Sequence, residues 1–176
     1  IDLPLRNYHG SSIEDQLNYL YHIINNNYSG RIYYFSNGST LTLFLSALQS
    51  ENIYLFDLTL KSLKIIIDNN KAICEFHAVV STILYRFTII HEECILLNIL
   101  NLIKILIQLR EGYVLVINNF NFFEINIFNY KNIVLETLLE TFLELYYCEY
   151  TLSYHLVILL ERSDFTNGFR RIAKFK

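Results

Sequence analysis

The chain has 176 residues, of which 53% are hydrophobic, 15% aromatic and 18% charged. This composition excludes a disordered tail or linker and indicates a soluble domain that buries its own core. The net charge of −3 excludes a global field that attracts nucleic acid, so such binding would need a local basic patch.

The cysteines and histidines favour neither a disulfide framework nor a metal site. Three cysteines are widely spaced, form no C-x-x-C pair and make no zinc spacing with the five histidines. We expect buried free thiols in a reducing, intracellular compartment, with no metal and no cofactor. His91 to Cys94 reads H-E-E-C at a predicted helix start, where Glu92 and Glu93 fit first-turn acids better than metal ligands.

The N-terminal part predicts a helix. Ser11 to Glu14 has the form of a capping box, with a serine three residues before a glutamate. An apolar stripe at helical spacing follows, and Asn25 to Gly30 is expected to end the helix. The members of the stripe are Leu17, Leu20, Tyr21 and Ile24.

A strand, a turn and a helix are predicted next, over Arg31–Phe35, Ser36–Thr40 and Leu41–Leu48. This order is the context of a phosphate-binding loop. The turn, however, has one glycine and no lysine and is too short to wrap a triphosphate. We therefore interpret it as a tight connection on the same kind of scaffold.

Two further strands are predicted at Asn52–Asp57 and Leu84–Ile90, with helical segments at Leu58–Asp68 and Ala72–Ile83 between them. The second strand is rich in β-branched and aromatic residues. A long, largely buried helix is predicted over Glu92–Leu109.

The central prediction is a buried strand at Tyr113–Ile117, five apolar residues that follow Gly112. Such a run is typical of the middle of a parallel sheet. It ends at Asn118 and Asn119, where a nucleotide hydrolase would hold Mg²⁺ with an acidic residue.

The C-terminal part predicts a helix at Asn132–Tyr147, a buried strand at His155–Leu160 and a return strand at Phe169–Phe175. Asn167-Gly168 is a strong hairpin signal between the last two. The elements together predict a three-layer α/β domain with a mostly parallel sheet and a C-terminal antiparallel hairpin. One domain is expected over residues 1–176, with a lead and helix at 1–30 and a core at 31–176, and no internal repeat is evident.

In this order the elements resemble those of RecA-like recombinases, which have a P-loop NTPase-like fold. Residues 31–48 stand in the place of the strand, phosphate loop and helix. Residues 93–119 stand in the place of the helix that leads into the Walker B strand. Residues 155–175 stand in the place of the late strand and hairpin, with R-R-I-A-K in the return strand.

The chain departs from the family at both nucleotide motifs. Gly38, Ser39 and Thr40 stand where the family has its phosphate-loop lysine and Ser/Thr, and Asn118 and Asn119 stand where it has its acidic residue. Without these groups the transition-state charge of phosphoryl transfer has no stabiliser. The resemblance therefore implies a pseudo-ATPase, not an enzyme.

The resemblance implies a nuclear, non-catalytic recombinase paralog of the Shu-complex type. Such a subunit belongs to a DNA-binding complex that assists filament assembly in homologous recombination and DNA repair. A heteromer with another RecA-like subunit is expected, and no membrane. The alternative is a structural RecA-like subunit of a tRNA-modification assembly of the Elongator type, and an active P-loop ATPase comes third.

The candidate DNA contacts are basic residues in and near the predicted hairpin, which could reach phosphates without reading sequence. The alternative is that they are ordinary edge-strand charges that deter aggregation. These residues are Arg162, Arg170, Arg171 and Lys174.

An aromatic cluster beyond the central strand is a candidate partner interface. It consists of Phe120, Phe122 and Phe123, and core packing is the alternative role.

Overall fold

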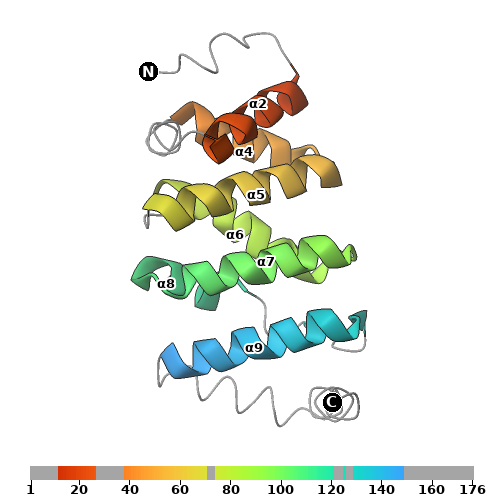
Figure 1. Ribbon diagram of the computed structural model, residues 1–176, viewed down its shortest axis with the longest axis vertical. Coiled ribbons are helices and arrows are strands. Elements are labelled where there is room, and N and C mark those ends of the chain that lie inside the picture. Colours follow the sequence, from red (N-terminus) through yellow and green to blue (C-terminus); the bar gives the residue numbers. More distant parts are fainter. Residues whose placement is uncertain (1–11, 27–37, 71–73, 121–124, 126–128, 149–176) are drawn as a thin grey trace.

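A computed structural model shows a stack of helices (Figure 1). The structure describes residues 12–26, 38–70, 74–120, 125 and 129–148, and in these ranges it has helices and no strand. Two short 3₁₀ turns, η1 (Cys74–Phe76) and η2 (Arg86–Thr88), flank α6. The α-helices are α2 (Ile13–Asn26), α4 (Gly38–Gln49), α5 (Ile53–Asn70), α6 (His77–Tyr85), α7 (Glu93–Leu106), α8 (Arg110–Asn119) and α9 (Asn132–Cys148).

The helices form two rows, and the chain alternates between them. In the first row α2, α5, α7 and α9 lie side by side in that order, and α4, α6 and α8 form the row behind (Figure 1). The colours of α5, α7 and α9 run in the same sense, so these helices are parallel. This arrangement is that of an α-solenoid. Each level, meaning one helix of the first row with the helix behind it, is stabilised by packing on the levels next to it.

The first row has a regular period. Its helices begin at residues 13, 53, 93 and 132, so each starts about 40 residues after the one before. The buried positions of α5, α7 and α9 follow the same register. The matching triplets are Leu55, Ile95 and Val134; Phe56, Leu96 and Leu135; Thr59, Ile99 and Leu138; Ser62, Leu102 and Thr141; Leu63, Ile103 and Phe142; and Ile66, Leu106 and Leu145.

The expected three-layer α/β fold is therefore wrong for the described residues, and its central strand is the clearest case. Residues 113–117 lie inside α8. Val116 is fully buried, whereas Val114 is 48% exposed. In a strand these two side chains would share one face, so their opposite environments follow the helical period and not the period of two.

The strands expected at 52–57 and 84–90 are also wrong. Leu55 and Phe56 are consecutive buried residues in α5, and residues 84–90 include the end of α6 and the turn η2. Only part of each apolar run is buried, because a helix turns its other side chains, such as Tyr54 and Tyr85, toward solvent. A short apolar run has no period of its own, so the β-branched and aromatic content misled the prediction.

The helices predicted at 41–48, 92–109 and 132–147 are confirmed as α4, α7 and α9. The first predicted helix is confirmed as α2, with its expected stripe turned toward the core. Its cap lies one residue later than expected: Ser12 Oγ accepts the Asp15 backbone N–H at 3.1 Å and donates to Asp15 Oδ2 at 2.8 Å. The strands expected at 31–35, 155–160 and 169–175 lie outside the described residues.

One glycine is required where α7 gives way to α8. Gly112 is buried, and a Cβ atom added there would overlap the backbone carbonyl oxygen of Leu106. The first turn of α8 therefore lies directly against the last turn of α7.

We expect Gly112→Ala to lower the free energy of unfolding by about 2 kcal/mol, because the backbone must shift to admit the methyl group. Thermal unfolding followed by circular dichroism should show a melting temperature about 6 °C lower. Asn118→Ala, on the exposed side of the same helix, is the control and should change it little. Equal stability of the Gly112 variant and wild type would contradict the close approach.

Buried hydroxyls in the core provide a second test. Among the described residues, Thr59 Oγ1 on α5 is buried without a hydrogen-bond partner, whereas Thr141 Oγ1 on α9 donates to the Thr137 carbonyl at 2.7 Å. We expect Thr59→Val to raise the free energy of unfolding by about 1 kcal/mol, because a partnerless hydroxyl is costly to bury. Thr141→Val should give no gain in the same denaturation experiment. An equal gain at both positions would contradict this difference in hydrogen bonding.

Candidate binding cleft

The residues predicted for the two nucleotide motifs lie on two different helices. Gly38, Ser39 and Thr40 lie in the first turn of α4, which packs on α2, α5 and α6. Asn118 and Asn119 lie at the end of α8, which packs on α6 and α7, and Asn119 Nδ2 donates to the Leu115 carbonyl at 2.9 Å. The asparagines therefore end a helix and not a strand.

Phe120 is a core residue. It is 4% exposed, and its ring centroid lies 5.0 Å from that of Phe87 and 6.5 Å from that of Phe142. This environment fits the core-packing alternative for Phe120.

The other members of both predicted surfaces lie outside the described residues. They are Phe122 and Phe123 of the aromatic cluster, and Arg162, Arg170, Arg171 and Lys174 of the predicted DNA contact.

The H-E-E-C sequence marks the start of α7, as predicted. Glu92 is the N-cap residue and Glu93 is the first helical residue, and the Glu93 carboxylate lies 3.0 Å from Lys131 Nζ. The described residues contain no group of histidine, cysteine and acidic side chains that could hold a metal ion. Cys94 is a free, exposed thiol, so the prediction of buried thiols is wrong at this position.

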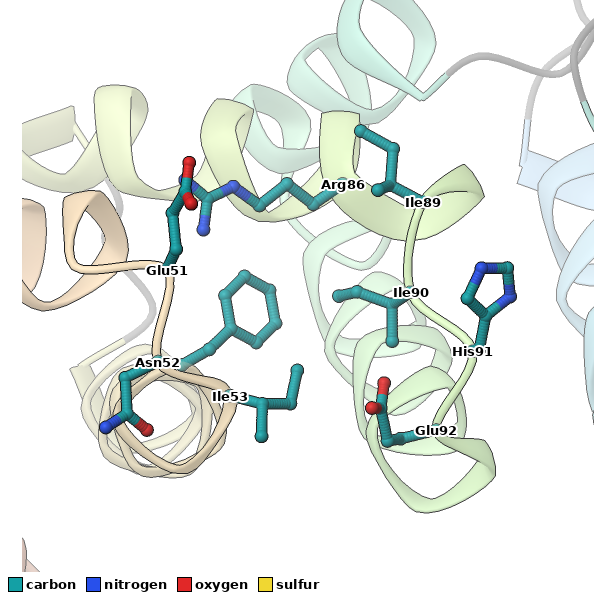
Figure 2. Close-up of a pocket in the computed structure, with 9 residues that line it drawn as sticks. Glu51, Asn52, Ile53, Arg86, Ile89, Ile90, His91 and Glu92 are labelled. Atoms are coloured by element: carbon teal, nitrogen blue, oxygen red, sulfur yellow. The ribbon is translucent and has the colours of Figure 1, made fainter.

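A cleft lies where two successive levels of the stack begin. One wall is the connection from α4 to α5, and the other is η2 with the connection to α7 (Figure 2). We call it the loop cleft; its volume of about 430 Å³ is within the range of ligand pockets. Its lining residues are Glu51, Asn52, Ile53, Phe56, Arg86, Ile89, Ile90, His91 and Glu92.

Local hydrogen bonds hold the α5 side of the loop cleft. Asn52 Oδ1 caps α5 by accepting the backbone N–H groups of Tyr54 at 2.9 Å and Leu55 at 3.3 Å. Glu51 before it has a φ of 56°, the left-handed region that turns the chain sharply out of α4. The wall is therefore set by a cap and a turn, and it does not depend on a bound partner.

The loop cleft combines an apolar floor with an apolar mouth. Phe56 and Ile90 are buried in its floor, whereas Ile53 is 41% and Ile89 60% exposed. The Arg86 guanidinium lies 5.8 Å from the centre of the Phe56 ring and extends toward Glu51 (Figure 2). Two exposed aliphatic side chains beside a concavity with an apolar floor make the loop cleft a candidate interaction site.

Two carboxylates stand at the rim of the loop cleft, Glu51 on one wall and Glu92 on the other (Figure 2). Both residues are exposed, and in the described part of the chain neither has an ion-pair partner. Within the described part of the chain Glu92 makes no side-chain cap to α7, and the residue is exposed.

A second pocket, of about 480 Å³, lies over α2, α5 and α7 and is more polar. One of its lysines, Lys61, is paired within the protein. Lys61 Nζ lies 2.6 Å from Asp57 Oδ2, and this hydrogen bond raises the pKa of Lys61. The other oxygen of Asp57 accepts from Asn98 Nδ2 at 3.2 Å. These contacts tie α5 to α7, so we interpret this pocket as part of the stack.

No family model matches the chain, and neither the curated proteins nor the solved structures contain a significant match to it. In the ranges that the structure describes, no helix is both long and apolar enough to cross a membrane.

Sequence reasoning missed the loop cleft because its two walls are far apart in the chain. Ile53 and Ile89 were assigned to strands, and Arg86 and Glu51 carried no role. One signal was present: Asn52 stands two residues before the first backbone N–H that it caps, which is typical of a helix start.

Neighbouring isoleucines in the cleft give a test of its geometry. We expect Ile89→Ser to change the free energy of unfolding by less than about 0.5 kcal/mol, because that side chain is mostly exposed. Ile90→Ser should lower it by about 2 kcal/mol or more, because its side chain is 8% exposed. Urea denaturation of both variants measures the difference, and equal losses would contradict the placement of the two residues.

Proposed function

We propose that this chain is a protein-binding scaffold, a helical array whose loop cleft receives an apolar side chain from a partner polypeptide. The observation that carries the proposal is the exposure of Ile53 and Ile89, 41% and 60%, at the mouth of a cleft with an apolar floor. Burying them against a partner would release about 25 cal/mol for each Å² of apolar surface covered.

The array supports this function because contacts join the elements of the two walls directly. Asn98 on α7 donates from Nδ2 to Asp57 Oδ1 on α5 at 3.2 Å, and the Arg86 guanidinium of η2 lies 5.8 Å from the centre of the Phe56 ring on α5. The two walls are therefore tied to each other within the protein. A preformed cleft spares the partner the cost of ordering the site.

The recombinase-paralog function, its DNA partner, the Elongator-type alternative and nuclear localisation stay predictions. They depended on a RecA-like scaffold, and the described residues form a helical stack. No described residue adds support for them, so the proposed function rests on the loop cleft alone.

Selection from a random peptide-display library tests the proposal. We expect enrichment of peptides that bind wild-type protein and lose at least tenfold in binding to Ile89→Asp, because the carboxylate would be buried under the anchor side chain. Val114→Asp is the matched control, since Val114 is also about half exposed but lies on α8.

Peptides that bind wild type and the Ile89 variant with equal affinity would contradict the proposal. So would a selection in which no peptide is enriched on wild type over the Ile89 variant. Equal loss in the Val114 variant would show that any new surface charge has the same effect, and it would also count against the loop cleft.

A further inference from the structure

Charge at the rim of the loop cleft points to the chemistry of its partner. This step rests on the proposed function and goes beyond it. We infer that the partner segment carries a lysine or arginine within a few residues of its apolar anchor, and that Glu92 and Glu51 receive this cation.

The first argument is the state of the cleft's own charges. Arg86 has its guanidinium over the Phe56 ring, a cation–π arrangement, and it extends toward Glu51 (Figure 2). The positive charge of Arg86 is therefore already in contact with side chains of the cleft itself. Glu92 stands on the opposite wall, after Ile90 and His91 in the chain and away from Arg86 (Figure 2).

The second argument is the state of the two rim carboxylates themselves. Glu51 and Glu92 are both exposed, and in the ranges that the structure describes neither lies within ion-pair distance of a lysine or arginine. A cation on a partner segment would therefore meet an unpaired carboxylate on either wall.

The third argument is the geometry of the site. An apolar side chain on the floor would place its neighbours over the rim, where Glu51 and Glu92 stand on opposite walls (Figure 2). Docking there would partly desolvate the carboxylate, and an unpaired, desolvated carboxylate is unfavourable. A basic neighbour removes that cost, whereas an acidic neighbour adds repulsion. The site thus discriminates by charge as well as by shape.

Three displayed libraries test this inference. Each has one random apolar position, and its flanking positions are restricted to Lys and Arg, to Ser and Thr, or to Asp and Glu. We expect the basic library to give binders at least fivefold tighter than the neutral library, and the acidic library to give the weakest. In Glu92→Gln the advantage of basic flanks should fall by threefold or more, and Glu51→Gln should reduce it further.

Glu14→Gln on α2 is the control, because it removes an exposed carboxylate of equal charge outside the cleft. Its preference for basic flanks should equal that of wild type. The advantage should also shrink as salt rises from 50 to 500 mM, since salt screens exposed charges.

The outcomes separate this inference from the proposed function. The neutral and basic libraries could give binders of equal affinity, all of which lose binding to Ile89→Asp. That result would support the apolar cleft and overturn the charge preference. Tightest binding by the acidic library would overturn it as well and would assign recognition to Arg86. If basic peptides bind Ile89→Asp as well as wild type, they bind elsewhere by charge, and both proposals fail.

Discussion

Burial of the same stripe of side chains, level after level, is the constraint on which the fold depends. On α5, α7 and α9 the buried positions repeat in register, so each helix presents similar surfaces to its neighbours. Because the apolar faces are covered only when the helices stack, no level is stable alone. The polar contacts, such as Lys104 with Glu140, lie at the exposed edges of this packing and contribute little free energy.

The stack also explains where a binding site can form. Parallel helices in one row bring their starts to one edge, so the connection before α5 and the connection before α7 become neighbours although they are 40 residues apart. The loop cleft is the space between these two connections. The wall before α5 is set by local features, the Asn52 cap and the turn at Glu51, and the floor belongs to the core. Function can then vary through the connecting segments while the register stays the same.

Several parts of the fold follow from local sequence alone. The helices at 13–26, 93–106 and 132–148 have apolar stripes at helical spacing or acids in the first turn, so they can be predicted without neighbours. The repeat could also have been found, because helix starts recur about every 40 residues. Residue identity does not reveal this repeat, because only the buried positions recur. Thr59, Ile99 and Leu138, for example, occupy the same position with three different side chains.

The sequence by itself determined the amphipathic helices, their caps and a core of aliphatic and aromatic side chains. Only the tertiary structure decided whether the continuous apolar runs, above all 113–117, form a helix or a strand. Such a run satisfies a buried strand and a buried helix equally, and the packing of α8 on α6 and α7 selected the helix. The loop cleft was decided in the same way, because Ile53 and Ile89 meet only when two levels of the stack lie side by side.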